Sequence, residues 1–78
     1  MLIDLVKALE GMELDYTLVS LKRIDMPFDN FIASIVIRDR YNVYIVQEGD
    51  IIDYKEGCET VGEALDFVTF IDLVLGEL

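Results

Sequence analysis

The sequence contains no histidine and only one cysteine, Cys58. Without histidine the chain cannot build a Ser-His-Asp or Cys-His catalytic arrangement, and it lacks the usual zinc ligand. A lone cysteine cannot form an internal disulfide, which is consistent with a reducing compartment. We expect Cys58 to be a half-buried small residue at the entrance of a helix.

Long apolar runs are also missing. The longest strand-like run without charge is FIASIVI, residues 31–37, whereas a membrane-spanning helix needs roughly 20 apolar residues. The first residues include Asp4 and Glu10 and do not begin with a basic segment, unlike a secretory signal peptide. We therefore expect a cytoplasmic protein that contacts no membrane.

Basic residues are scarce, since six Lys and Arg stand against sixteen Asp and Glu for a net charge of −10. The excess is uneven. Residues 1–40 hold seven acids and five bases, whereas residues 41–78 hold nine acids and one base. Such a chain is repelled by nucleic acid and by anionic membranes, and it is attracted by basic protein surfaces. We expect a basic protein surface as the partner and no direct contact with nucleic acid.

The 78 residues, 54% of them hydrophobic, predict a single domain spanning residues 1–78. So short a chain cannot bury all of its apolar surface. Part of that surface is therefore expected at an interface, which a homodimer could provide.

The hydrophobic pattern predicts a helix, then strands, then a second helix. The first helix covers residues 2–10, with Gly11 as its C-cap. Strands are predicted at 16–24, 31–38 and 43–48, and residues 51–55 form either a fourth strand or an extended loop. The last helix covers about 61–75. This order predicts an α+β two-layer sandwich with both helices on one face of an antiparallel sheet.

The last helix shows the clearest signals. Thr60 and Glu63 have the spacing of a capping box. At 100° per residue, one broad apolar arc holds Ala64, Phe67, Val68, Phe70, Ile71, Val74 and Leu75. Leu65 and Leu73 fall in or beside the opposite, polar arc. They indicate either a wider buried face or a small interface.

Acids recur at every third position in GDIIDYKEG, residues 49–57. A calcium loop needs oxygen ligands where this segment has Ile51 and Ile52, so we expect no metal site. A hydrolase that works with an acid pair needs two carboxylates inside a cleft, and no nucleophile elbow, phosphate loop or dinucleotide motif is present. We therefore expect no enzyme activity and no cofactor.

The remaining interpretation is a protein-binding acidic surface, although acids can also serve solubility alone. Alternate residues of a strand lie about 6.6–6.8 Å apart, which is comparable to the spacing of phosphates along a nucleic-acid backbone. The candidate partner-binding residues are Asp15, Asp39, Glu48, Asp50, Asp53, Glu56 and Glu59.

Two stretches carry a family resemblance: IDLVKALEGMELDYTLVSL (3–21) and IASIVIRDRYNVYIV (32–46). Around the tripeptides at 4–6, 15–17 and 36–38, the chain resembles small phage-encoded anti-CRISPR proteins that inhibit type II-A Cas9. The resemblance covers roughly residues 3–47. It implies a DNA mimic that fills the basic cleft reading the PAM in a host nuclease, with Asp15 as the matching acidic position. The family's hairpin tip is longer and acidic, whereas DRYN (39–42) is short and contains Arg40.

Overall fold

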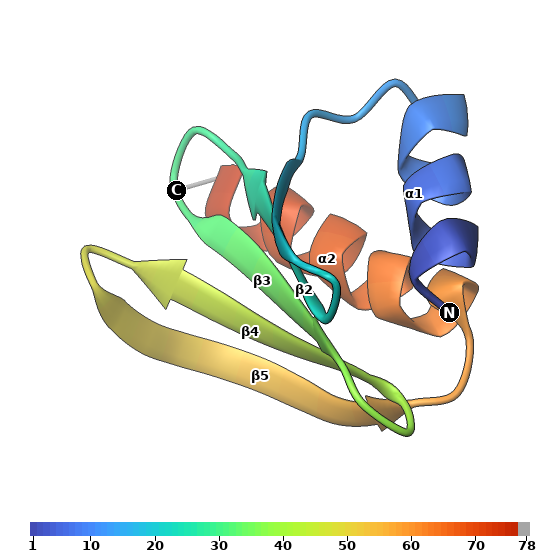
Figure 1. Cartoon of the computed structure of the whole chain (residues 1–78). Coiled ribbons are helices and arrows are strands. Elements are labelled where there is room, and N and C mark those ends of the chain that lie inside the picture. Colours follow the sequence, from blue (N-terminus) through green and yellow to red (C-terminus); the bar gives the residue numbers. More distant parts are fainter. Residues whose placement is uncertain (77–78) are drawn as a thin grey trace.

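The computed structural model describes residues 1–76 and contains two helices and five strands (Figure 1). The elements are α1 (Leu2–Gly11), β1 (Thr17–Ser20), β2 (Arg23–Pro27), β3 (Ile32–Ile37), β4 (Tyr41–Gln47), β5 (Asp50–Cys58) and α2 (Val61–Gly76). The predicted α+β class is confirmed, with five antiparallel strands where the sequence suggested three or four. Within these residues, no helix combines the length and the apolar character needed to cross a membrane.

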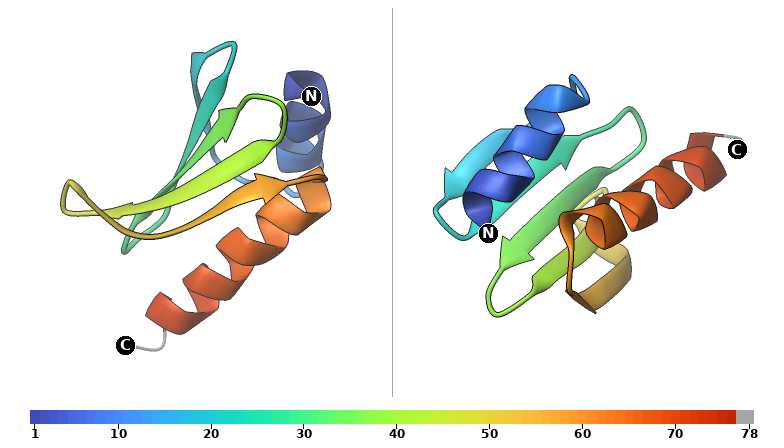
Figure 2. Two further views of the ribbon diagram at one scale, coloured as in Figure 1. Left: turned by 90° about the horizontal axis from the view of Figure 1, so that it is seen from below. Right: turned by 90° about the vertical axis from the view of Figure 1, so that its right-hand side faces the viewer.

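The strands form one meander in the order β1-β2-β3-β4-β5, and both helices lie on the same face of the twisted sheet (Figure 2). That face carries the core because alternate residues of the central strands point toward it. The buried apolar residues are Leu5, Leu9, Ile24, Met26, Phe31, Ala33, Ile35, Ile37, Tyr41, Val43, Ile45, Cys58, Ala64, Leu65, Val68 and Ile71. The alternation predicted for residues 31–37 is confirmed, and Cys58 is fully buried rather than half-buried.

The single strand predicted at residues 16–24 is wrong, because a tight turn divides this segment into β1 and β2. Ser20 pairs with Arg23 across the turn, and the Ser20 hydroxyl accepts a hydrogen bond of 3.1 Å from the Lys22 amide. Every residue of β1 is exposed, so the buried alternation belongs to the next strand. That strand runs as far as Pro27, which lies at its end.

The segment left open at residues 51–55 is part of a nine-residue strand, β5, at one edge of the sheet. Its pairing with β4 contains two register shifts. The β4–β5 hairpin reaches beyond the helices (Figure 1). Consequently residues 50–56 are all exposed, although they belong to a regular strand.

Helix α2 buries an arc that overlaps the predicted one at Ala64, Val68 and Ile71 but is shifted toward Leu65. It packs against β4, β5 and α1, and its buried residues include Leu65. Phe70, placed by the pattern in the apolar arc, is 60% exposed, and Leu73 is 62% exposed. The predicted N-cap is confirmed, because the Thr60 hydroxyl accepts a hydrogen bond of 3.1 Å from the Glu63 amide.

The first helix also ends differently from the prediction. Gly11 belongs to α1, and the cap residue is Met12. The left-handed conformation that usually favours glycine falls instead on Glu13, with φ of 56°. The Leu14 amide donates to the Leu9 carbonyl at 3.0 Å and closes the helix.

Candidate protein-binding surface

The charged residues separate toward the two ends of the sheet. One end collects the α1–β1 connection, the β2–β3 turn, the β4–β5 turn and the last turns of α2 (Figure 1). We call this the acid end, and its acids are Glu13, Asp15, Asp29, Glu48, Asp50 and Asp72.

The opposite end of the sheet carries most of the bases. The Ile37 amide donates to the Lys22 carbonyl at 2.7 Å, which places the β1–β2 turn beside the β3–β4 turn. Four of the six bases lie in or next to these two turns, namely Lys22, Arg23, Arg38 and Arg40. We call this the base end. Arg23 and Arg40 are paired there with Asp25 and Glu59, so the base end has mixed charge, whereas the acid end, within residues 1–76, has acids without bases.

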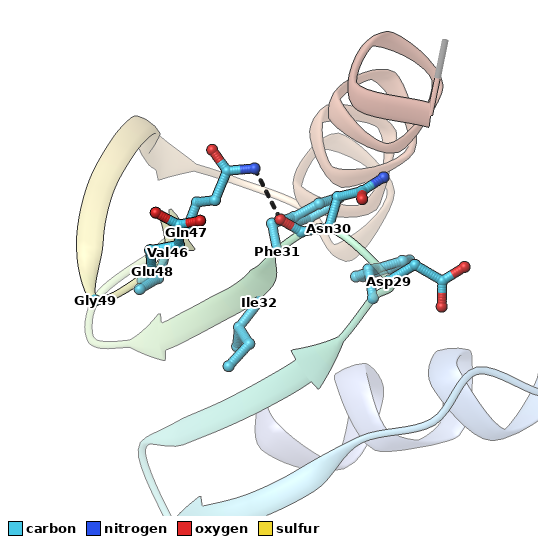
Figure 3. A pocket seen from close by; sticks show the side chains of 9 residues that line it. Asp29, Asn30, Phe31, Ile32, Val46, Gln47, Glu48 and Gly49 are labelled. Carbon is cyan, nitrogen blue, oxygen red and sulfur yellow. Dashed lines mark hydrogen bonds between the residues drawn. The ribbon is translucent and has the colours of Figure 1, made fainter. Parts of the chain in front are cut away.

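Two adjoining hollows lie at the acid end. The first, about 390 Å³, lies between the β2–β3 and β4–β5 turns (Figure 3). The Gln47 side-chain amide donates to the Asn30 carbonyl at 2.9 Å and links these turns. The second hollow, about 280 Å³, lies where Glu13, Asp15 and Asp72 approach the β2–β3 turn. The two hollows share Phe28 and Asp29.

The lining combines apolar surface with carboxylates. The Phe28 and Phe31 rings stack with their centroids 4.7 Å apart, and Leu14 and Pro27 add apolar surface in the second hollow. Among the described residues, no Lys or Arg lines either hollow. Apolar and aromatic surface bordered by carboxylates suits a side chain with an apolar stem and a cationic head, as in Arg or Lys.

Both helices add negative potential at this end. The C-terminus of a helix carries a partial negative charge, because its last carbonyls lack intrahelical partners. Helix α2 ends here, since the Asn30 side-chain amide donates to the Leu75 carbonyl at 3.5 Å. Helix α1 ends next to Leu14, which lines the second hollow. Neither helix has a basic residue in its last turn.

Two acids at this end hold strained backbone conformations. Of the described residues other than glycine, Glu13 and Glu48 have positive φ, at 56° and 53°. Glu48 and Gly49, at φ of 86°, form a two-residue hairpin turn between Gln47 and Asp50. Such turns normally have Asn or Asp before the glycine. Strained conformations of this kind concentrate at functional sites.

The structure places the sequence-predicted site residues in three groups, all of them exposed. Asp15, Glu48 and Asp50 lie at the acid end. Asp53 and Glu56 lie farther along the edge strand β5, and Asp39 and Glu59 lie at the base end. The acids of residues 48–59 are therefore spread along β5 and do not form one compact cluster.

Glu56 and Glu59, both outside the acid end, already have side-chain partners. The Tyr44 hydroxyl donates to Glu56 at 2.8 Å, and this hydrogen bond raises the pKa of Tyr44. Glu59 forms an exposed ion pair of 3.1 Å with Arg40. In contrast, the structure records no ion pair for Asp15, Asp29, Glu48 or Asp72 within residues 1–76. These acid-end carboxylates are available to an external cation.

Sequence reasoning missed Glu13, Asp29 and Asp72 as members of this site. The order of the connections along the chain contains a signal that places Glu13 and Asp29 at this end. In a meander, every second connection returns to the same end of the sheet, and the first, third and fifth connections each carry acids at this end. Residues 1–76 contain no group of three or more acidic or cysteine side chains placed to hold a metal ion.

No protein-family model, no curated protein and no solved structure matches the chain. The function is therefore argued from the geometry and the charge of this surface.

Proposed function

We propose that the protein binds a basic surface of a partner protein through its acid end. One observation carries this proposal: acids from separate connections converge on two adjoining hollows that no base lines. If the acids served only solubility, we would expect them to be interspersed with the bases over the surface. Here four of the six bases lie at the opposite end of the sheet instead.

The chemistry favours arginine and lysine as the bound groups. Hydrogen bonds between a guanidinium and a carboxylate contribute roughly 1.5–3 kcal/mol each when they are shielded from water. Phe28, Phe31 and Leu14 contribute apolar surface beside the carboxylates in these hollows. The negative field would also steer a basic partner toward this end and raise the association rate.

The strained backbone supports the proposal independently of charge. An L-residue in the left-handed region costs roughly 1–2 kcal/mol, and glycine or asparagine would reduce that cost at Glu13 and Glu48. Acidic side chains occupy both positions nevertheless. Retention of a costly residue type is expected where the carboxylate has a use outside the fold.

In its most specific form, the proposal makes the protein a DNA mimic in the host cytoplasm that blocks the nucleic-acid groove of a defence nuclease such as Cas9. The resemblance to anti-CRISPR proteins supports this form, and its one matching acidic position, Asp15, lines the second hollow. Arg40, which departs from the family pattern, lies at the base end and leaves the acid end free. No catalytic step is required of such an inhibitor.

The test is competition with labelled DNA on a panel that includes type II-A Cas9 and several restriction nucleases. Two triple variants each remove three negative charges. One changes the acid end by Asp15→Asn, Asp29→Asn and Asp72→Asn, and the other changes Asp53→Asn, Glu56→Gln and Glu59→Gln along and beyond β5. We expect the unmodified protein to displace DNA from at least one nuclease. The acid-end variant should lose at least tenfold in affinity, or about 1.4 kcal/mol, and the β5 variant should lose much less.

Equal losses in the two variants would show that net charge, and not the acid end, directs binding. Failure of the unmodified protein to displace DNA from any member would reject the nuclease form of the proposal.

A further inference from the structure

The face of the sheet opposite the helices is uncovered and largely apolar. A shallow hollow of about 240 Å³ lies on it, lined by Arg23, Ser34, Val36, Tyr44, Val46 and Ile51. Around this hollow Ile32 is 43% exposed, Ile51 60% and Tyr54 59%. Tyr44 and Tyr54 form a cross-strand pair with ring centroids 6.4 Å apart. Exposed apolar surface of this extent on a small protein marks an interaction site.

Several polar groups on this face already have partners on the same face. Arg23 donates two hydrogen bonds to Asp25, at 2.9 and 3.0 Å, and the Ser34 hydroxyl donates to the same carboxylate at 2.8 Å. Partial burial opposes the ionisation of Asp25, but the bonds from Arg23 and Ser34 hold its pKa below the usual range. Glu56 accepts a hydrogen bond from Tyr44. A partner could therefore cover this face without leaving these polar groups unpaired.

The charge distribution selects one arrangement of two chains. We call the sheet face opposite the helices the open face. If the open faces of two chains meet with their strands antiparallel, the acid end of each chain lies beside the base end of the other. Each chain keeps its net charge of −10, but this arrangement holds the two acid ends at opposite ends of the pair, and exposed charges are screened over about 8–10 Å at physiological salt. A parallel arrangement would place both acid ends together.

We propose that a second copy of the chain covers this face, giving an antiparallel dimer with four layers in the order helices, sheet, sheet, helices. Packed sheets of this kind are common, with a separation of about 10 Å. The whole molecule measures 33 × 23 × 21 Å. A standard interface takes roughly 800 Å² from each partner, so the dimer would use most of one face of a molecule of this size. The open face and the acid end adjoin, because Val46 lines the hollow on the open face and also the first hollow of the acid end. Among the described residues, no acid-end carboxylate lines the hollow on the open face, so the dimer can be tested separately from the proposed function.

Sedimentation velocity on two matched variants tests the proposal. Ile51→Lys places a charge on the open face, and Leu73→Lys places the same charge on the outer side of α2. The two side chains are similarly exposed, at 60% and 62%, so neither change should disturb folding, which circular dichroism checks. We expect the unmodified protein to be dimeric at about 100 µM. Ile51→Lys should weaken the dimer at least tenfold, and Leu73→Lys should leave it unchanged. A monomeric unmodified protein, or a dimer disrupted only by Leu73→Lys, would overturn the proposal.

The orientation has its own measurement. A spin label on Asp50→Cys marks the acid end, and the buried Cys58 should resist labelling. In the antiparallel dimer the two labels should be separated by a distance comparable to the 33 Å length of the molecule. A short distance would overturn the antiparallel arrangement. The acid-end triple variant should still dimerise, so failure of partner binding and failure of dimerisation can be told apart.

Discussion

Glu48 occupies a turn position that another residue would fill at lower cost. With Gly49 it forms a turn in which both central residues have positive φ, and Asn-Gly is the preferred pair for such turns. Glu48→Asn should therefore raise the free energy of unfolding by about 0.5–1 kcal/mol. Urea denaturation measures this. Asp50→Asn is the matched control, because it removes the same charge beside the turn without relieving strain. Equal effects of the two changes would attribute the gain to charge alone.

Cys58 lies in the core and should be chemically silent in the folded protein. Burial, together with the neighbouring Glu63 carboxylate, raises the pKa of the Cys58 thiol. Because the thiolate is the reactive form, the folded protein should react with a thiol reagent at pH 8 far more slowly than the protein in urea. A colorimetric thiol assay follows both reactions. Equal rates in the two conditions would show that the β5–α2 junction opens readily.

At the level of elements, two phenylalanines of α2 differ in burial, so substituting each one compares a packed side chain with an exposed one. Phe67 is partly buried and packs against the core, whereas Phe70 is 60% exposed. Phe67→Ala should lower the free energy of unfolding by roughly 2 kcal/mol, below the 3–5 kcal/mol typical of a fully buried phenylalanine. Phe70→Ala should change it by less than about 0.5 kcal/mol. Thermal or urea unfolding compares the pair, and a larger loss for Phe70→Ala would mean that α2 is rotated from its position here.

The element types were largely predictable from the sequence. Both helices, the central strands and the cap at Thr60 follow from periodicity and local chemistry. The division between β1 and β2 was not predictable in the same way, since the segment of residues 16–24 contains no Gly, Pro, Asn or Asp to mark a turn. The turn inside it depends on packing of the following strand, whose Ile24 and Met26 are fully buried.

That one missed turn explains why the acid end was missed. Counting residues 16–24 as one strand assigns the acids at 13–15 and at 29 to opposite ends of the sheet. Counting two strands brings them to the same end, with Glu48. Asp72 could not be assigned from sequence at all, because its place depends on how α2 crosses the sheet. The exposed position of Phe70 has the same origin, since periodicity defines an apolar arc but not which part of it the sheet covers.

At the level of the whole molecule, the sequence places most of the excess negative charge in the second half of the chain. In the folded protein, the position of each acid along the strands and turns decides at which end of the sheet its charge lies. Asp15 and Asp29 come from the first half of the chain, yet they share an end with Glu48 and Asp72. Asp39 and Glu59 were predicted as part of the same surface, and they lie at the base end, where Glu59 pairs with Arg40. Topology, more than composition, therefore decides which acids can act together.

The most direct test of the central claim is a titration of the ¹⁵N-labelled protein with a short all-arginine peptide, followed by NMR. If the acid end is the binding surface, the largest changes in amide chemical shift on adding peptide should occur around Leu14, Asp29 and Glu48. These changes should decrease steeply as salt is added. The acid-end triple variant should lose these shifts, while the triple variant of Asp53, Glu56 and Glu59 should keep them. Shifts that are largest along residues 53–59, or that are spread evenly over the exposed acids, would contradict the account.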